Sequence, residues 1–307
     1  MAVAELEAET LRTVKEEGQF LLIWRRFRKH KLALAGFTVI FLIALAVALA
    51  PMIAPYDPVK DYNLINRNAP PSLEHLMGTD ELGRDVFSRM LYAGRISLFV
   101  AFTVVLVSES FGAVIGAISG YFSEWLDSVI QRTVELLITI PTLPLLLAVS
   151  ALLRGITIPG LPREWSSAVI IIIVLTAFGW MGSTVLVRGM VLSLRTQAFA
   201  EAARALGSSH TRIILRHMLP NSLAPIIVNA TLALGGVIIV ESALSFLGFG
   251  IQPPVATWGN MLNEYQADMW TQPAKVFFPG LAIFICSLAF NYMGDGLRDA
   301  VDPRLKM

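Results

Sequence analysis

Long apolar runs alternate with shorter polar stretches along the whole chain. Six runs reach or approach the ~20 residues that one α-helix needs to cross the hydrocarbon core of a bilayer. They cover residues 32–53, 96–118, 134–153, 168–186, 223–246 and 276–292, of which the last is the shortest. The apolar positions are continuous and do not alternate with a period of two, so the pattern favours helices over barrel strands. The sequence predicts an all-α membrane protein with six transmembrane helices.

The composition supports this class and removes several others. Hydrophobic residues make up 55% of the 307 positions, charged residues only 15%, and the mean hydropathy is +0.64. A net charge of +1 with scattered basic residues argues against a nucleic-acid partner and leaves membrane lipid as the surrounding medium. Cys286 is the single cysteine, which excludes an intrachain disulfide and a cysteine metal cluster.

The distribution of lysine and arginine predicts the orientation of the chain. With the N-terminus inside and six crossings, the cytoplasmic segments hold 16 of these residues and the outer segments hold 8. This bias places both termini in the cytoplasm. The predicted organisation is an N-terminal tail (1–31), a first helix (32–53), an extracytoplasmic segment (54–95), a five-helix core (96–295) with a cytoplasmic loop at 190–222, and a C-terminal tail (296–307).

The loop between the fourth and fifth runs has the sequence of two short helices. Residues 197–206 are mostly strong helix formers, and Gly207 follows as a natural residue to end a helix. Ser208 or Ser209 is placed to cap a second short helix, and Pro220 is expected to stop that helix from running straight into the next span. The sequence therefore predicts an alanine-rich helix-turn-helix elbow at the membrane face.

This elbow resembles the EAA loop of the permease subunits of ABC importers. The match comprises Glu201, Ala202, Ala203, Gly207, Leu219 and Pro220, whereas His217 stands where the general pattern has isoleucine. The resemblance implies that the loop docks on a partner ATPase. Glu201 and Arg204 are expected to be polar anchors to the ATPase or to the base of the permease, and Ala202, Ala203 and Gly207 are expected to allow a close fit. The coupling residues are expected to be Ala200, Glu201, Ala202, Ala203, Arg204, Ala205, Leu206, Gly207 and Ser208.

Three further strings extend the resemblance along most of the chain. They are GTDELGRD at 78–85, GFGIQPP at 248–254 followed by WGN at 258–260, and GDGLRD at 294–299 followed by DPR at 302–304. Together with the elbow they resemble, in order, the C-type permease subunit of the dipeptide and oligopeptide importers. The resemblance implies a type I ABC importer bundle in a bacterial or archaeal cell membrane.

The same resemblance implies partners and cargo. A second permease subunit would complete the pathway as a heterodimer, two ATPase subunits would bind ATP and Mg, and an extracytoplasmic solute-binding protein would deliver a peptide. Nickel chelates and glutathione remain alternative cargoes. An ATP-independent channel or secondary carrier, which needs no elbow, is the alternative function.

The chain itself has no sequence signature of catalysis. It contains no Gly-x-x-x-x-Gly-Lys-Ser/Thr loop, so it has no phosphate-binding loop of that kind and depends on a partner for ATP. We expect a transport subunit without catalytic, cofactor-binding or metal-binding residues. Asp80, Glu81 and Asp85 lack the spacing of a calcium loop, and a local turn network is the favoured interpretation.

Polar residues within the apolar runs are candidates for the interior of the bundle, because ionisable groups are costly in lipid. Glu109, between Ser108 and Ser110, is expected to form inter-helix hydrogen bonds. Asn229 and Glu241 are candidates for the translocation pathway. For Glu241 the alternative is solvation, or bonding to neighbouring helices, near an outer helix end.

Small residues and prolines predict how the runs pack and bend. Gly112, Gly116 and Gly120 are spaced four apart, share one helical face and permit close approach of another backbone. Pro141 and Pro144 each remove a backbone donor from the third run and should bend it.

Overall fold

The computed structural model describes residues 19–122 and 124–301 of the protein. Within these residues the chain forms helices and loops, with one isolated β-bridge between Thr79 and Asp85. The helices are α2 (Gln19–Phe27), α3 (Lys31–Ala48), α4 (Ala50–Ile53), η1 (Leu64–Asn66), α5 (Val86–Phe122), α6 (Trp125–Thr139), α7 (Thr142–Leu153), α8 (Arg163–Gly179), α9 (Met181–Leu194), α10 (Ala198–Ala205), α11 (His210–Ile213), η2 (Ile214–Met218), α12 (Leu219–Phe246), α13 (Trp258–Tyr265), η3 (Gln266–Asp268) and α14 (Pro273–Val301).

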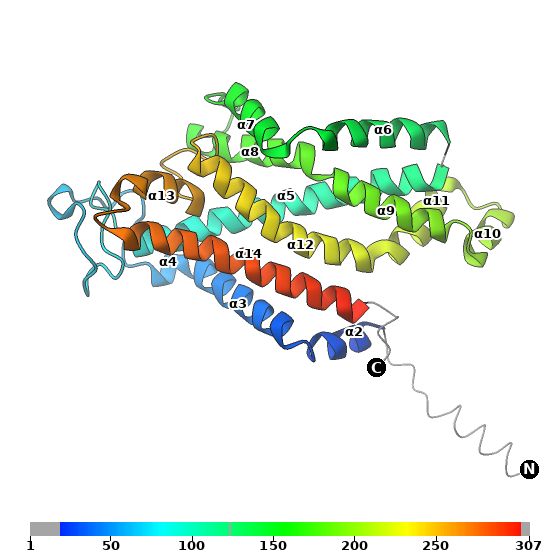
Figure 1. Ribbon diagram of the computed structural model, residues 1–307, viewed down its shortest axis with the longest axis horizontal. Coiled ribbons are helices and arrows are strands. Elements are labelled where there is room, and N and C mark those ends of the chain that lie inside the picture. Colours follow the sequence, from blue (N-terminus) through cyan, green and yellow to red (C-terminus); the bar gives the residue numbers. More distant parts are fainter. Residues whose placement is uncertain (1–18, 123, 302–307) are drawn as a thin grey trace, which may run out of the picture.

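The long helices lie side by side in one elongated bundle (Figure 1). Five helical stretches of the described chain are long and apolar enough to span a membrane, and the pair α6 and α7 supplies a sixth if it counts as one broken span. The five are Lys31–Ala48, Val86–Phe122, Trp165–Leu194, His210–Phe246 and Pro273–Val301. The prediction of a helical membrane protein with six hydrophobic segments is confirmed.

The third predicted span is broken and not a single helix. Helices α6 and α7 meet at an angle of 89°. Ile140 is extended at the break, with φ −77° and ψ 128°, and Pro141 caps the start of α7. Proline disfavours the helical conformation of the residue before it and cannot donate a main-chain hydrogen bond, so the helix ends here. The predicted bend is thus confirmed at Pro141 as a complete break, whereas Pro144 lies in the first turn of α7, where a missing N–H is tolerated.

Several helix ends differ from the sequence prediction. Helix α5 begins at Val86, ten residues before the expected span, and α14 continues to Val301 into the expected tail. Pro220 does not separate the elbow from the fifth span, contrary to our expectation. The chain is helical from His210 to Phe246 because η2 is a wider π turn, which places Pro220 in the first turn of α12. A missing N–H is tolerated there.

Helix α5 is the centre of the bundle and packs against α3, α6, α8, α9 and α12. The closest contact is with α9. A Cβ atom at Gly112, Gly116 or Gly120 would lie within 2.4, 2.5 or 2.7 Å of a main-chain oxygen of Trp180, Thr184 or Arg188, respectively. The predicted glycine face is therefore confirmed as the surface along which two backbones touch.

The two ends of the bundle are formed by different segments. The loop before α5 and helix α13 lie at one end, and α10 and α2 lie at the other (Figure 1). Helix α2 packs on the C-terminal part of α14 through Phe27 and Ala300. Both candidate sites described below are located at these ends.

Candidate functional site

The elbow, residues 197–220, has the predicted helix-turn-helix geometry. Helix α10 ends in a turn in which the amide of Gly207 donates to Arg204 O (2.9 Å) and that of Ser208 donates to Ala203 O (3.0 Å). Gly207 has φ +75°, a conformation that is easy only for glycine. The hydroxyl of Ser209 then accepts from the amide of Arg212 and caps α11. The local sequence therefore determines this turn.

The coupling residues divide between two faces of α10. Ala200 and Ala203 are buried against Val187, Val191 and Ile213 of the same chain. Ala203 therefore packs within this subunit, and the role of these residues in coupling stays a prediction. The exposed residues are Glu201, Ala202, Arg204, Ala205, Leu206 and Gly207, with Ser208 partly buried.

Arg204 and His210 attach the elbow to the bundle. Arg204 Nη2 donates a 2.7 Å hydrogen bond to the main-chain oxygen of Arg195, at the end of α9. The ring of His210 lies 2.9 Å from the hydroxyl of Tyr121 at the end of α5. Arg204 thus has an internal contact beside its predicted anchoring role. The carboxylate of Glu201 makes no hydrogen bond or ion pair with any described residue and points to the outside.

Large apolar side chains are also exposed on the elbow. Leu206 is 86% exposed at its tip, and Phe199 and Leu215 are also exposed. Exposed apolar side chains together with an unpaired carboxylate, at the end of the bundle, are compatible with a protein-docking surface.

The buried polar pair between the spans joins residues 120 positions apart. Asn229 Nδ2 on α12 donates to Glu109 Oε1 on α5 at 2.8 Å, and Ser183 Oγ on α9 donates to the main-chain oxygen of Glu109. The predicted inter-helix bonding of Glu109 is confirmed. Its sequence neighbour Ser108 donates to Val104 O of its own helix instead. Asn229 is partly buried and its pathway role stays a prediction.

Glu241 lies beneath the loop that follows α12. It is 1% exposed, and Ser245 Oγ donates to Glu241 Oε1 at 2.7 Å while accepting from the amide of Ile251. Gly259 approaches so closely that a Cβ there would lie 2.5 Å from the Cα of Ser242. The solvated alternative for Glu241 is thus wrong, and in this conformation the chain itself covers the residue.

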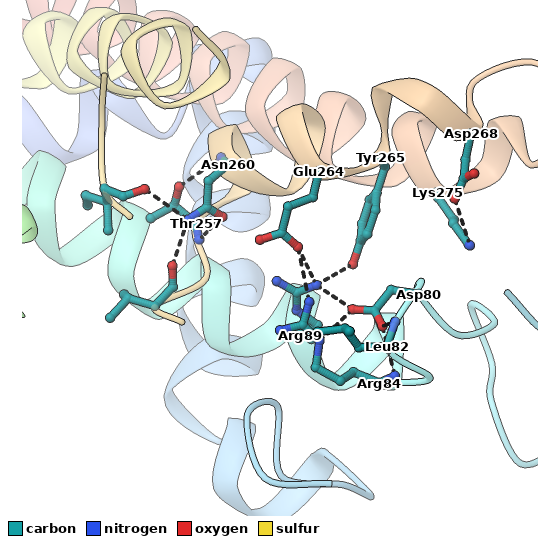
Figure 2. A network of polar contacts seen from close by, with 12 residues as sticks. Asp80, Leu82, Arg84, Arg89, Thr257, Asn260, Glu264, Tyr265, Asp268 and Lys275 are labelled. Carbon is teal, nitrogen blue, oxygen red and sulfur yellow. Dashed lines mark hydrogen bonds and ion pairs between the residues drawn. The ribbon is translucent and has the colours of Figure 1, made fainter. Parts of the chain in front are cut away.

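A buried ion network, here called the clamp, joins the loop before α5 to α13 (Figure 2). It consists of Asp80, Arg84, Arg89, Glu264 and Tyr265. Arg89 is 1% exposed, and its Nη1 lies 2.6 Å from Asp80 Oδ2, 2.7 Å from Glu264 Oε2 and 3.0 Å from Tyr265 Oη. Arg84 Nε donates to the same Asp80 oxygen at 2.7 Å.

Asp80 also organises its own turn. Its Oδ1 accepts from the amides of Leu82 and Arg84, each at 2.9 Å. Burial acts to raise the pKa of Asp80, but the guanidinium groups of Arg89 and Arg84 outweigh it and hold that pKa below 3.8. The predicted local turn network is confirmed in the hydrogen bonds of Asp80 and Asp85.

Further contacts fasten the same loop. Asp85 Oδ2 accepts from the amide and hydroxyl of Ser88, each at 2.7 Å, and the ring of His75 lies 3.0 Å from Asp85 Oδ1. Lys275 Nζ donates to Asn68 Oδ1 at 2.7 Å. Thr79 Oγ1 donates to Asn66 O. The long-range partners Glu264, Tyr265 and Lys275 had no signal in the sequence, because nothing local relates them to residues 66–89.

The sequence also matches two known families, which together cover most of the chain. Residues 112–307 match the family described as "Binding-protein-dependent transport system inner membrane component", and residues 18–71 match "N-terminal TM domain of oligopeptide transport permease C".

Several curated proteins are similar to the chain. It is 41% identical over 283 residues to the glutathione transport system permease protein GsiD of Escherichia coli O157:H7, covering 92% of this chain and 90% of that protein. It is 40% identical over 289 residues to the dipeptide transport system permease protein DppC of Bacillus subtilis (strain 168), covering 92% and 85%. The chain therefore belongs to the inner-membrane permease components of binding-protein-dependent transport systems, as a permease subunit of the peptide ABC importer type.

Proposed function

We propose that this permease subunit imports small peptides and that its elbow couples the bundle to an ATPase. Two ATPase subunits on the cytoplasmic side would bind ATP and Mg, a second permease would complete the pathway, and an external solute-binding protein would deliver the cargo. In this arrangement both termini are cytoplasmic.

The coupling proposal rests on one observation, namely that α10 has one exposed face and one face buried against the bundle. Glu201 and Leu206 face outward, whereas Ala200 and Ala203 seat the helix on the bundle. Arg204 and His210 tie the elbow to the ends of α9 and α5. A displacement of the exposed face would therefore move α9 and α5 as well, because the inner face of the elbow is closely packed against the bundle.

The names of the relatives support the cargo class. One relative is named for dipeptides and another for glutathione, and glutathione is itself a tripeptide derivative. Both cargoes carry ammonium and carboxylate groups on a short backbone. We therefore place small zwitterionic peptides first and nickel chelates last.

The elbow proposal is tested by charge reversal. Glu201→Lys places a cation where an anion is expected to meet the ATPase, so peptide uptake should fall at least tenfold, about 1.4 kcal/mol of lost coupling. The variant should remain inserted and folded, because Glu201 has no contact with described parts of its own chain. Uptake is measured with a labelled dipeptide in membrane vesicles that contain the whole importer.

Glu81→Lys is the matched control, because Glu81 is also exposed but belongs to the loop before α5, which lies at the opposite end of the bundle from α10 (Figure 1). It should leave uptake unchanged. Normal uptake and normal ATPase recovery in Glu201→Lys would refute the coupling role.

Affinity purification of the tagged chain from mild detergent tests the assembly. We expect a second permease, ATPase subunits and a binding protein to co-purify. Competition of dipeptide uptake by unlabelled dipeptide, glutathione and a nickel chelate then ranks the cargoes. Recovery of this chain alone, together with uptake that does not depend on ATP, would favour a channel or carrier.

A further inference from the structure

A cavity of about 530 Å³ lies between α7, the start of α8 and the loop that follows α12. These elements pack against one another (Figure 1). The volume is within the range of about 300–1,000 Å³ that is usual for small-molecule sites. One wall of the cavity comes from the string GFGIQPP at 248–254, which has no role in the proposed coupling.

Hydrogen bonds fix the loop that forms this wall. The side-chain amide of Gln252 donates to the main-chain oxygens of Gly248, at 3.1 Å, and Gly250, at 2.9 Å. The main-chain amide of Gln252 donates to Ser167 Oγ on α8 at 3.2 Å. The neighbouring Ile251 is 1% exposed. Because the loop is bonded to itself and to α8, the wall keeps its shape without a ligand, which favours binding.

A buried hydroxyl on α7 also lines the cavity. Ser150 is 3% exposed, and its Oγ forms no hydrogen bond with any residue that the structure describes. Buried polar side chains nearly always have a partner, because leaving one unpaired costs free energy. A hydroxyl that lines a cavity and lacks a partner within the chain is therefore placed to donate a hydrogen bond to a bound molecule.

Arg154 supplies a cation to the same cavity. It follows the last residue of α7, four positions after Ser150, so the two residues share one side of that helix end. Its guanidinium carbon lies 5.8 Å from the centroid of the Phe249 ring, and the group forms no ion pair with a described residue. The ring attracts the cation but offers it no oxygen acceptor, so the N–H donors are available to an anion.

We propose that this cavity binds the free carboxylate of a short peptide through Arg154 and Ser150. The proposal rests on the proposed importer function and adds a contact between the cargo and this chain. A guanidinium donates two parallel hydrogen bonds to a carboxylate, and the hydroxyl supplies a third donor. The apolar side chains of Leu153, Ile171 and Phe249 line the rest of the cavity and accommodate the apolar part of the peptide.

A neighbouring cavity provides a comparison within the same chain. It has a volume of about 630 Å³ and shares Pro254 with the first cavity. Its Arg95 lies 5.6 Å from the centroid of the Tyr92 ring and is exposed, as Arg154 is. None of the described buried polar groups without a partner lines this second cavity. Arg95 is therefore the matched control for Arg154.

Equilibrium binding tests the site without relying on transport. A labelled dipeptide and its C-terminal amide are bound to the purified importer in the absence of the solute-binding protein. We expect the free acid to bind about tenfold more tightly than the amide. Arg154→Gln should lose this preference by weakening only the binding of the acid. Ser150→Ala should weaken the binding of the acid about threefold without lowering the unfolding temperature, because it removes a hydroxyl that has no partner in the chain. Arg95→Gln should bind both ligands as the wild type does.

Equal binding of the acid and the amide by the wild type, or no measurable binding of the acid at millimolar concentration, would overturn the proposal. Unchanged binding in either Arg154→Gln or Ser150→Ala would do the same. Poorer recovery of the solute-binding protein with Arg154→Gln, without a change in dipeptide binding, would also overturn it by assigning the cation to a carboxylate of that protein.

The same experiment separates this site from the proposed function. Carboxylate-dependent binding by an importer that does not take up the dipeptide would refute only the proposed transport of that cargo. ATP-dependent uptake of the dipeptide, with equal binding of acid and amide, would refute only the site. Co-purification of the ATPase confirms that each variant is assembled before its binding is measured.

Discussion

The clamp and the elbow lie at opposite ends of the same bundle and treat their charged side chains in opposite ways. In the clamp, Arg89 is buried and shared by Asp80, Glu264 and Tyr265, so the loop and α13 are locked to α5. In the elbow the inner face is packed, but the charged and apolar side chains at its tip are left exposed. The clamp satisfies its charges within this chain, whereas the elbow leaves the carboxylate of Glu201 exposed, as the proposed docking on an ATPase requires.

Removal of the central cation should break the clamp and produce the largest effect. Arg89→Met removes the buried cation between the carboxylates of Asp80 and Glu264 and leaves only Arg84 to pair with them. Loss of one member of a buried ion network costs about 3–5 kcal/mol. The thermal unfolding temperature of the purified importer should fall markedly. Arg95→Met is the control, since Arg95 is on the same helix but exposed, and an equal loss in both variants would contradict the special role of Arg89.

The close contact between α5 and α9 should give the next largest loss of stability when it is disturbed. In Gly112→Val the new side chain meets the main-chain oxygen of Trp180, where even a Cβ would be at 2.4 Å. Overpacking of this kind typically costs about 1–3 kcal/mol. Gly182→Val is the control, because nothing lies within 4 Å of a Cβ at Gly182. Unfolding temperatures that do not differ between the variants would show that α5 and α9 can separate cheaply.

Acid should weaken the clamp selectively. The pKa of Asp80 is lower in the folded protein than in the unfolded chain. The ionised carboxylate therefore stabilises the fold at pH values above the unfolded-state pKa, and this stabilisation is lost as the pH falls through the folded-state pKa. The free energy of unfolding that Asp80 supplies should therefore be constant between pH 5 and 7 and decline below about pH 4. Subtraction of the pH profile of Asp80→Asn isolates this contribution. An identical fall in both proteins would assign the acid sensitivity to other carboxylates.

The smallest stability change is expected in the elbow. Gly207→Val forces a β-branched residue to φ +75°, which costs about 1–2 kcal/mol, although no atom lies within 4 Å of the new Cβ. Unfolding temperature should change little while peptide uptake falls. Gly207→Asn should retain more uptake, because asparagine tolerates this conformation. Equal uptake in the two variants would show that the turn is not required for coupling.

Local sequence was sufficient wherever a feature depends on neighbouring residues. The turn at Gly207, a cap by Ser208 or Ser209, a bend at Pro141 and the glycine face of α5 were all predicted from spacing and residue type. Prediction failed at Pro220, because the π turn that accommodates it depends on how the elbow packs. The family resemblance came from short strings in a fixed order, and the matches to known permeases confirm it.

By itself, the sequence determined that the chain crosses a membrane as helices, because continuous apolar length and the need to satisfy backbone hydrogen bonds leave no other solution. The tertiary structure alone decided which polar groups meet. Asn229 joins Glu109 across 120 positions, Arg89 joins Tyr265 across 176, and Ala203 turns inward while Leu206 turns outward. Such pairings depend on how helices rotate and register against one another, and that is set by packing between segments far apart in the chain.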